Sequence, residues 1–295
     1  MSLTDPKVNQ APPRPTLEMF EQHWRLDQRD KTAQAEFWNR RAESFNQHKN
    51  SGDSQLHRGE LMGELAERCG LRPDSLVLDI GCGSGHNTLI LADQVQRLEA
   101  FDLSPRMIEL ARQNAAKEGN SERVNFQVLD WAEADLGSLG WERRFDLVLA
   151  SRTPAICDRP SLEKMMAAAR GSCLIITFAD TRSELKDHLS RVLNREGQAM
   201  RAGRSFYCAF NLLWLMGYFP EISYLGHGWE SELSREDAFL VHSRYFEQGG
   251  PLSEAEKETL GRELDRLVEA DGLVREKVRA KMALMRWDVN ERHSD

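Results

Sequence analysis

A run of glycines directly after a short apolar segment is the feature that most constrains this chain. The pattern of Val77–Ile80 predicts a buried strand, and Gly81, Gly83 and Gly85 follow at alternating positions before a helical pattern begins. Glycines between a strand and a helix let the backbone turn tightly and approach a ligand closely. The run therefore predicts a ligand site at the carboxyl end of a strand in an α/β fold. The alternative is a tight turn that holds no ligand.

The charge beside the glycines indicates what kind of ligand fits. Their spacing is G-x-G-x-G, whereas the dinucleotide fingerprint is G-x-G-x-x-G. Asp79 stands two residues before Gly81, where a carboxylate repels a pyrophosphate and attracts a ligand with ammonium and sulfonium groups. At ~4 Å and an intermediate dielectric constant this attraction is about 4 kcal/mol at most. S-adenosylmethionine has these groups; the alternative is that Asp79 caps a helix or fixes the loop.

Alternating strand and helix patterns surround the glycine run. We expect a parallel sheet with helices on both faces, because strands that alternate with helices form βαβ units. Strands are expected at 75–80, 97–102, 124–129, 145–150 and 173–179, and helices at 86–94, 105–118 and 160–169. Further helices are expected at 182–195, 205–216, 234–246 and 253–270, a late strand at 221–229, and either a strand or a helix end at 281–289.

The ends of the second and third expected strands carry polar side chains. Asp102 follows Gly81 by about 20 residues, the position at which a carboxylate binds ribose hydroxyls. Asp130 can accept a hydrogen bond from an adenine amine, and Trp131 can cover the adenine ring. The alternatives are that Asp102 caps the helix that begins near Pro105, and that Trp131 fills the core.

Four segments carry a family resemblance. They are D-I-G-C-G-S-G from Asp79, F-D-L-S-P-R-M-I-E-L-A-R from Phe101, V-L-D-W-A-E-A-D from Val128 and F-D-L-V-L-A from Phe145. In this order and spacing they closely resemble the class I S-adenosylmethionine-dependent methyltransferases. The resemblance implies a Rossmann-like, seven-stranded, mostly parallel sheet with one reversed strand, and S-adenosyl-L-methionine as the cofactor.

The resemblance also implies roles for individual residues. It places the three glycines around the methionine moiety, Asp102 at the ribose, and Asp130 with Trp131 and Met107 at the adenine. The residues expected at the cofactor are Asp79, Gly81, Cys82, Gly83, Gly85, Asp102, Leu103, Met107, Asp130, Trp131 and Ser151. Cys82 is expected there as a small buried residue rather than a nucleophile, because no activating base stands beside it.

The acceptor side has weaker signals. The stretch Ser151–Ile156 follows the fourth strand and contains no N-P-P-Y or D-P-P-Y tetrapeptide, which disfavours DNA-adenine and glutamine methyltransferases. Arg152 can hold a carboxylate or phosphate of the substrate, or it can pair with a structural carboxylate. His227, between two glycines, is a weak candidate for a general base. The catalytic residue itself stays unidentified, because methyl transfer needs no enzymic nucleophile.

The segments on either side of the core suggest a cap on one catalytic domain. We expect a disordered arm over 1–15, a helical lid over 16–70, the cofactor-binding core over 71–180, and completion of the sheet with a substrate cap over 181–295. Phe37–Phe45 loosely resembles the helix that covers the cofactor in small-molecule methyltransferases. The longest apolar stretch, Ala209–Phe219, is too short to span a bilayer.

Composition bears on the partner. The net charge of −8 disfavours a general nucleic-acid binder, and five cysteines without a C-x-x-C pair suggest a reducing cytoplasm and no metal site. We therefore expect a cytoplasmic enzyme that acts on a small molecule, of open oligomeric state. The alternatives are an RNA or protein methyltransferase, and a non-catalytic binding protein of the same fold. The basic residues that favour RNA are Arg191, Arg195, Arg201 and Arg204.

Overall fold

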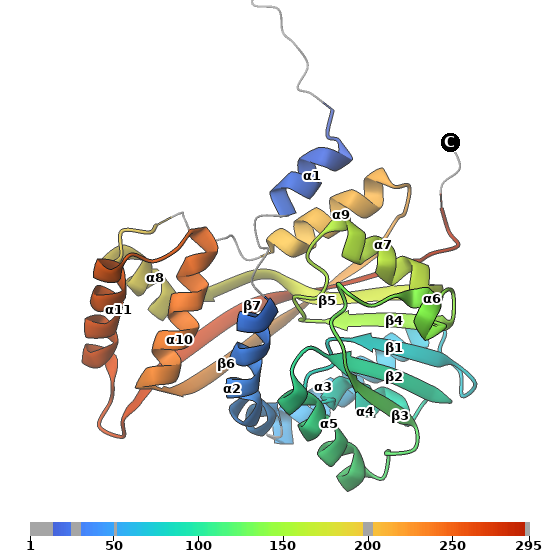
Figure 1. The fold of residues 1–295 in the computed structure, drawn as a ribbon, viewed down its shortest axis with the longest axis horizontal. Helices are drawn as coiled ribbons and strands as arrows, with labels where there is room; N and C mark the ends of the chain where they lie inside the picture. Colours follow the sequence, from blue (N-terminus) through green and yellow to red (C-terminus); the bar gives the residue numbers. More distant parts are fainter. Residues whose placement is uncertain (1–13, 25–30, 50–51, 197–202, 293–295) are drawn as a thin grey trace, which may run out of the picture.

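The protein forms one seven-stranded sheet with helices on both faces (Figure 1). The computed structural model describes residues 14–24, 31–49, 52–196 and 203–292. The strand order is β3-β2-β1-β4-β5-β7-β6. All neighbouring strands from β3 to β5 are parallel, whereas β7 runs antiparallel to both β5 and β6. The predicted sheet with one reversed strand is confirmed.

The first half of the sheet follows the predicted alternation closely. Its parallel strands are β1 (Leu76–Ile80), β2 (Arg97–Asp102), β3 (Val124–Val128), β4 (Phe145–Ser151) and β5 (Ala169–Ser183). The helices between them are α4 (His86–Ala92), α5 (Pro105–Glu118), α6 (Leu136–Leu139) and α7 (Arg159–Ala168).

Alternate side chains of the central strands feed two separate hydrophobic clusters. Leu78 and Ile80 of β1 face one cluster, and Val77 faces the other, as the period of two in a strand requires. The first cluster packs against α7, α1 (Leu17–Trp24) and α9 (Arg204–Leu215). The second packs against α4, α5 and α3 (Gly52–Arg68). The sheet is therefore buried on both faces, which accounts for its continuous apolar strands.

Three long strands leave the core and carry a second lobe. β5 has 15 residues, β6 (Glu221–Ser234) has 14 and β7 (Leu273–Asp288) has 16. At their far end α8 (Glu184–Val192), α10 (Arg235–Phe246) and α11 (Glu254–Leu267) surround a third hydrophobic cluster (Figure 1). The sequence left open whether 281–289 is a strand or a helix end, and the structure shows a strand through Asp288.

Helix α2 (Lys31–Lys49) connects the two parts of the molecule. It crosses in front of the extended strands, between α5 and α10 (Figure 1). Arg40, in the middle of α2, pairs with Glu236 and Asp237 of α10, and α2 also packs on α5.

Two further findings concern what the described part of the chain lacks. No helix in it is both long enough and apolar enough to cross a membrane. It also contains no group of three or more His, Cys, Asp or Glu side chains arranged to hold a metal ion. Residues 1–13 of the expected arm lie outside the described residues.

Candidate active site

The glycine loop has the backbone conformation that its sequence predicts. Gly81, Gly83 and Gly85 have φ angles of 69°, 56° and 83°, which side chains on L-residues rarely adopt. At Gly81 a Cβ atom would lie 2.1 Å from Oγ1 of Thr153. The loop therefore needs glycine there twice over, for its conformation and for close contact with the segment after β4.

Asp79 is a buried carboxylate that has a hydroxyl for a partner. It points from β1 toward α4, where the hydroxyl of Thr88 donates to Oδ2 at 2.5 Å. Burial raises the pKa of Asp79 to about 7, and the nearby carboxylate of Asp102 acts in the same direction. Among the described residues Asp79 forms no ion pair, so a cationic ligand is the group that this site lacks.

Asp102 organises the glycine loop from the end of β2. Its Oδ2 accepts from the amide of Gly83 at 2.9 Å, and its Oδ1 accepts from the amide of Ser104 at 2.9 Å. Burial raises the pKa of Asp102, and these amides oppose that shift. The residue that caps α5 is Ser104, whose hydroxyl accepts from the amide of Met107. The helix-cap alternative for Asp102 is therefore wrong, and each of its oxygens retains a lone pair for a ligand.

Helix α2 lies directly over this loop. A Cβ atom on Gly83 would be 3.6 Å from the ring of Phe45. Asn46 accepts from Asn114 of α5 at 2.9 Å and lies 3.0 Å from the ring nitrogen of His86. Asn39 accepts from the hydroxyl of Ser104 at 2.6 Å. The contacts place α2 where the lid was predicted, although its function as a lid stays a prediction.

The residues expected at the adenine divide into two groups. Asp130 and Leu103 are half-buried at the carboxyl edge of the sheet, and Asp130 accepts from the amide of Ala132. Trp131 is only 2% exposed, and its ring stacks on Phe101 at 5.6 Å. Its indole nitrogen donates to the carbonyl of Ser161 at 3.2 Å. This placement favours the core interpretation of Trp131.

Two more apolar residues bear on the same end of the site. Met107 is buried beneath α2 in a small cluster with Ala42 and Leu110. Val128, which the sequence reasoning missed, ends β3 with a side chain that is 50% exposed. A valine in a strand is normally taken as core, so no sequence signal distinguishes it. Its position makes Val128 a better candidate than Trp131 for covering an adenine ring.

Cys82 does not have the surroundings of a nucleophile. Burial raises the pKa of its thiol well above the usual range, and Asp79 and Asp102 add to the effect. The thiol donates weakly to the carbonyl of Gly83 at 3.5 Å. A protonated thiol is a poor nucleophile, so the surroundings agree with the expectation that Cys82 is not a nucleophile, although the residue is half-buried rather than buried.

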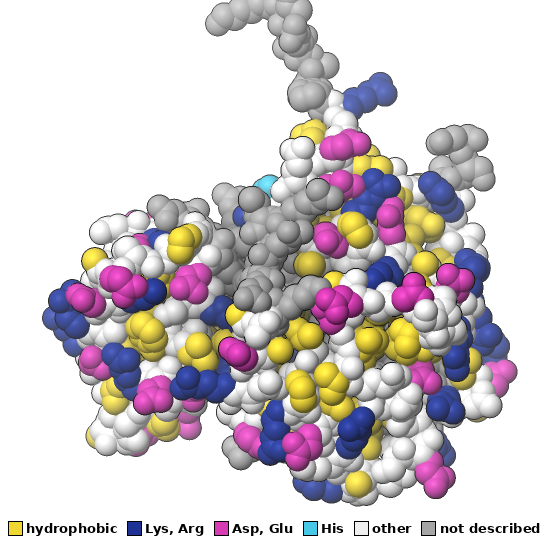
Figure 2. Space-filling model, viewed as in Figure 1, with side chains coloured by type: hydrophobic (Ala, Val, Ile, Leu, Met, Phe, Trp, Pro, Cys, Tyr) yellow, Lys and Arg dark blue, Asp and Glu magenta, His cyan; other side chains and the backbone are white. Residues whose placement is uncertain are grey.

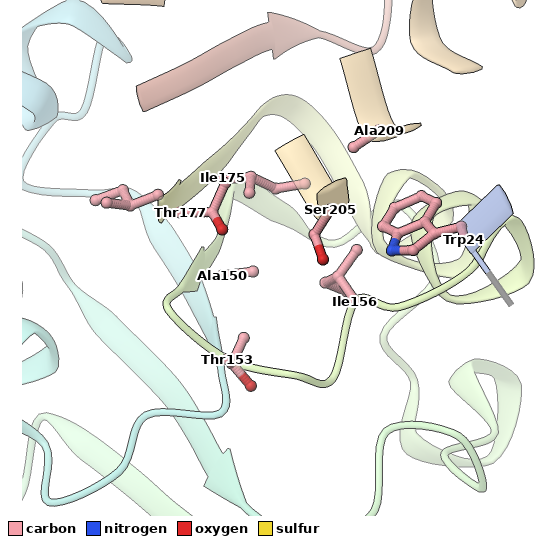
Figure 3. A pocket seen from close by; sticks show the side chains of 9 residues that line it. Trp24, Ala150, Thr153, Ile156, Ile175, Thr177, Ser205 and Ala209 are labelled. Carbon is pink, nitrogen blue, oxygen red and sulfur yellow. The ribbon is translucent and has the colours of Figure 1, made fainter. Parts of the chain in front are cut away.

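A small cavity adjoins the glycine loop on the side of β4 and β5 (Figure 3). Its volume is about 40 Å³. It is bordered by Thr153, the residue that touches Gly81, and by side chains of β5, α1 and α9. Ser151 lies at the end of β4, where its hydroxyl accepts from Asn87 at 3.0 Å. Thr153 lies in the stretch after β4 that the sequence placed on the acceptor side, and Trp24 is one of the N-terminal aromatics for which the sequence left a core stripe or a substrate cage open. Ser205 was missed, because a cavity lined from four separate segments has no linear motif.

The two weak catalytic candidates lie outside this cavity. Arg152 has a φ of 52°, and its amide donates to the carbonyl of Ile176 at 2.7 Å. Its side chain is not among the lining groups, although its neighbour Thr153 is. His227 lies on the part of β6 beyond the core, paired with Ala280, and its ring is 5.5 Å from that of Trp229. A catalytic role for either residue stays a prediction.

Comparison with known proteins assigns the family. Residues 77–173 match the model of a family described as "Methyltransferase domain". This segment is a class I methyltransferase domain. The matched span contains the glycine loop, Asp102 and Asp130, so the family resemblance predicted from the sequence is confirmed.

Curated relatives match only in part. Malonyl-[acyl-carrier protein] O-methyltransferase of Acetivibrio thermocellus is 38% identical over 79 residues, which are 26% of this chain and 25% of that protein. The chain spans about a quarter of the length of the first relatives it matches. An uncharacterised protein of Haemophilus influenzae is 25% identical over 237 residues, 77% of this chain and 81% of that protein.

A solved structure extends the likeness of the fold. Magnesium protoporphyrin IX methyltransferase from Synechocystis PCC 6803, solved with S-adenosylhomocysteine bound, has a TM-score of 0.51 and 14% identity. The likeness covers 87% of this chain and 99% of that one. At this identity it shows the fold alone.

Proposed function

We propose that this protein transfers a methyl group from S-adenosylmethionine to a small-molecule acceptor. The observation that supports this most directly is the pair of carboxylates, buried Asp79 and half-buried Asp102, beside a loop of glycines with positive φ. Within the described ranges neither carboxylate has a Lys or Arg partner. Withdrawing these two acids from water without a cation is costly, and a ligand with a positive ammonium and a positive sulfonium group offsets that cost.

The residues present fit this ligand. The glycine loop has the positive φ angles of a tight turn beside a ligand, Asp102 can accept from ribose hydroxyls, and Asp130 with the exposed Val128 adjoins the expected adenine. When bound, S-adenosylmethionine supplies an electrophilic methyl group.

The work of the chain itself is to position the reactants and exclude water. Phe45 of α2 covers the glycine loop, and Trp24 of α1 borders the adjacent cavity. None of the described residues that line the cavity is Asp, Glu, His or Lys. Rate enhancement in this proposal therefore rests on proximity and orientation rather than on a general base in the cavity.

The cofactor assignment is tested by calorimetry with S-adenosylhomocysteine, which keeps the ammonium, ribose and adenine groups. We expect wild-type protein to bind it and Asp102→Ala to weaken binding by about 10- to 100-fold, since charge-assisted hydrogen bonds are lost. Asp93→Ala, an exposed carboxylate at the far end of α4, is the control and should bind normally. Absence of binding by the wild-type protein, or equal affinity in Asp102→Ala, contradicts the proposal.

The surroundings of the arginines in the predicted basic stretch favour a small acceptor over RNA. Arg195 is buried and bonded to Glu256, and the guanidinium of Arg191 donates to a carbonyl of its own helix. Arg201 lies outside the described residues. Figure 2 shows basic and acidic side chains interspersed on the visible face. A salt-sensitive mobility shift with bulk tRNA would reverse this preference. A cytoplasmic location and the oligomeric state stay predictions.

A further inference from the structure

The cavity beside the glycine loop is too small for a whole metabolite. A volume of about 40 Å³ has room for about three water-sized groups. Because Thr153 both lines the cavity and touches Gly81, the cavity opens next to the proposed methyl donor. What enters it is therefore the end of the acceptor nearest the reaction, with the remainder outside.

Trp24 supplies a hydrogen-bond donor that the protein leaves unused. The side chain is 2% exposed, and its indole nitrogen has no hydrogen-bond partner within the described structure. Figure 3 shows this nitrogen on the edge of the ring that faces Ile156 and Ser205, across the cavity. Buried donors are nearly always paired, and this one borders a cavity, where an oxygen atom of a ligand can be its partner.

The position of Trp24 is held by contacts made elsewhere on α1. Phe20 packs edge-on against Tyr207 of α9 at 5.7 Å between ring centroids. Glu21 accepts from Arg159 of α7 at 2.8 Å. The helix that carries the indole is thus fixed against α7 and against α9, which borders the cavity, so the donor is oriented before any ligand arrives.

The rest of the lining selects against charge. Three hydroxyl side chains, Thr153, Thr177 and Ser205, contribute polar atoms, and the other described lining groups are Trp24, alanines and isoleucines. No charged side chain of the described chain lines the cavity. A carboxylate or ammonium placed here would lose its water without gaining an opposite charge. A carbonyl or hydroxyl oxygen loses far less and gains the indole N–H.

We infer that Trp24 determines acceptor specificity by donating a hydrogen bond to an uncharged oxygen at the reacting end of the substrate. This inference rests on the proposed function, because it treats the cavity as the acceptor end of a methyltransferase site. It assigns a substrate class: an uncharged carbonyl or hydroxyl compound whose buried end has about three heavy atoms, set in apolar surroundings.

The test follows the indole N–H signals of protein labelled with ¹⁵N-tryptophan. The Trp24 signal is assigned by its loss in Trp24→Phe. Acetone and acetate serve as probes, because they have equal numbers of heavy atoms and differ in charge. We expect acetone to move the Trp24 signal downfield in a saturable way and acetate to have little effect. Trp287 is the internal reference, since it is equally buried in the same hydrophobic cluster and its nitrogen is also unpaired.

A second variant guards against misfolding of Trp24→Phe. Ala209→Val fills the cavity from α9 and leaves the indole in place, so the acetone shift should disappear. The inference is overturned if acetone moves Trp24 and Trp287 alike, if acetate moves Trp24 more than acetone does, or if Ala209→Val leaves the shift unchanged. Calorimetry with S-adenosylhomocysteine on the same samples separates the two proposals. If the wild-type protein binds S-adenosylhomocysteine but acetone leaves its Trp24 signal unmoved, only the inference is refuted. If the wild-type protein does not bind S-adenosylhomocysteine, the proposed function is refuted.

Discussion

At the scale of single residues, the position of Asp79 that we propose for ligand binding lowers the stability of the fold at neutral pH. Its folded pKa of about 7 lies above the ordinary 3.8, because burial disfavours the charged form. Between these pH values the folded chain keeps a proton that the unfolded chain has lost. Stability therefore falls as the pH rises through this window. A cationic ligand reverses the balance by favouring the ionised form.

This predicts opposite effects of Asp79→Asn on stability and on binding. Between pH 5 and pH 8 the wild-type protein should lose about 2–3 kcal/mol more unfolding free energy than the variant, as two pKa units imply. The variant should also bind S-adenosylhomocysteine more weakly at pH 8. Urea unfolding at both pH values measures the first effect and calorimetry the second. Asp93→Asn should retain the wild-type pH dependence; an equally steep dependence in Asp79→Asn contradicts the argument.

Residues at strand ends were predictable to different degrees. The positive φ angles of Gly81, Gly83 and Gly85 and the place of Asp102 beside the loop could be predicted, because a sharp turn needs positive φ and a strand end faces the crevice. The orientation of Trp131 could not, because an aromatic residue at a strand end can turn toward a ligand or into the core. Its contact with Phe101 decides between them, and that contact is set by packing between distant segments rather than by local spacing.

At the scale of elements, one buried arginine holds the second lobe together. Arg195 follows α8 and donates to Glu256 of α11 and to the carbonyls of Gly250 and Pro251. Glu256 also completes the capping box with Ser253 at the start of α11. These bonds lower the pKa of Glu256 to about 2, the pairing with Arg195 contributing most. A lowered folded pKa means that the stabilisation is complete above pH 4.5 and is lost as the pH falls toward 2.

Arg195→Met should therefore loosen the lobe at neutral pH. The loss of a buried, multiply bonded cation is expected to cost about 3 kcal/mol. Hydrogen exchange at pH 7 should speed up in 247–267, while β1–β4 stay protected. The matched control is Arg262→Met, which replaces an exposed arginine of α11. If exchange in 247–267 is unchanged, or if the wild-type lobe is as stable at pH 2 as at pH 5, the pair does not hold the lobe.

The lengths of β5, β6 and β7 were the least predictable elements. The sequence pattern ended the strands near 179 and 229, but they continue to Ser183 and Ser234. In the extension the β6 side chains alternate between half-buried and exposed, so the apolar run that indicates a core strand stops. What holds these residues in the sheet is backbone pairing with β7, whose partners lie about 50 residues away. Such long-range pairing leaves little trace in local sequence.

At the scale of the molecule, the long strands join the two lobes into one structure. β5 and β7 pair from Ser172 with Asp288 in the core to Ser183 with Val278 at the lobe. A break between lobe and core would have to open this ladder and that of β6 with β7 at the same point. Since many backbone hydrogen bonds and three hydrophobic clusters share these strands, we expect core and lobe to unfold together.

The distribution of tryptophan makes this testable. The chain has seven tryptophans, and none lies in α8, α10 or α11. Tryptophan fluorescence therefore reports on the rest of the chain. Leu264→Ala creates a cavity inside the lobe, where Leu264 is fully buried, and should cost about 2–4 kcal/mol. If the molecule unfolds as one unit, Leu264→Ala should lower the urea midpoint measured by fluorescence as much as the midpoint measured by far-ultraviolet circular dichroism.

Trp229 of β6 lies on the extended part of the sheet, so its fluorescence could report on the lobe as well as the core. The comparison is therefore repeated in a Trp229→Phe background. Independent lobes would give the opposite result, because fluorescence from the core would keep its midpoint while circular dichroism became biphasic. The outcome bears on the proposed function, since α2 is bonded to α10 of the lobe through Arg40 and lies over the glycine loop through Phe45. If the lobe unfolds only with the core, α2 keeps both contacts for as long as the core is folded, as the predicted role of α2 in covering the cofactor site requires.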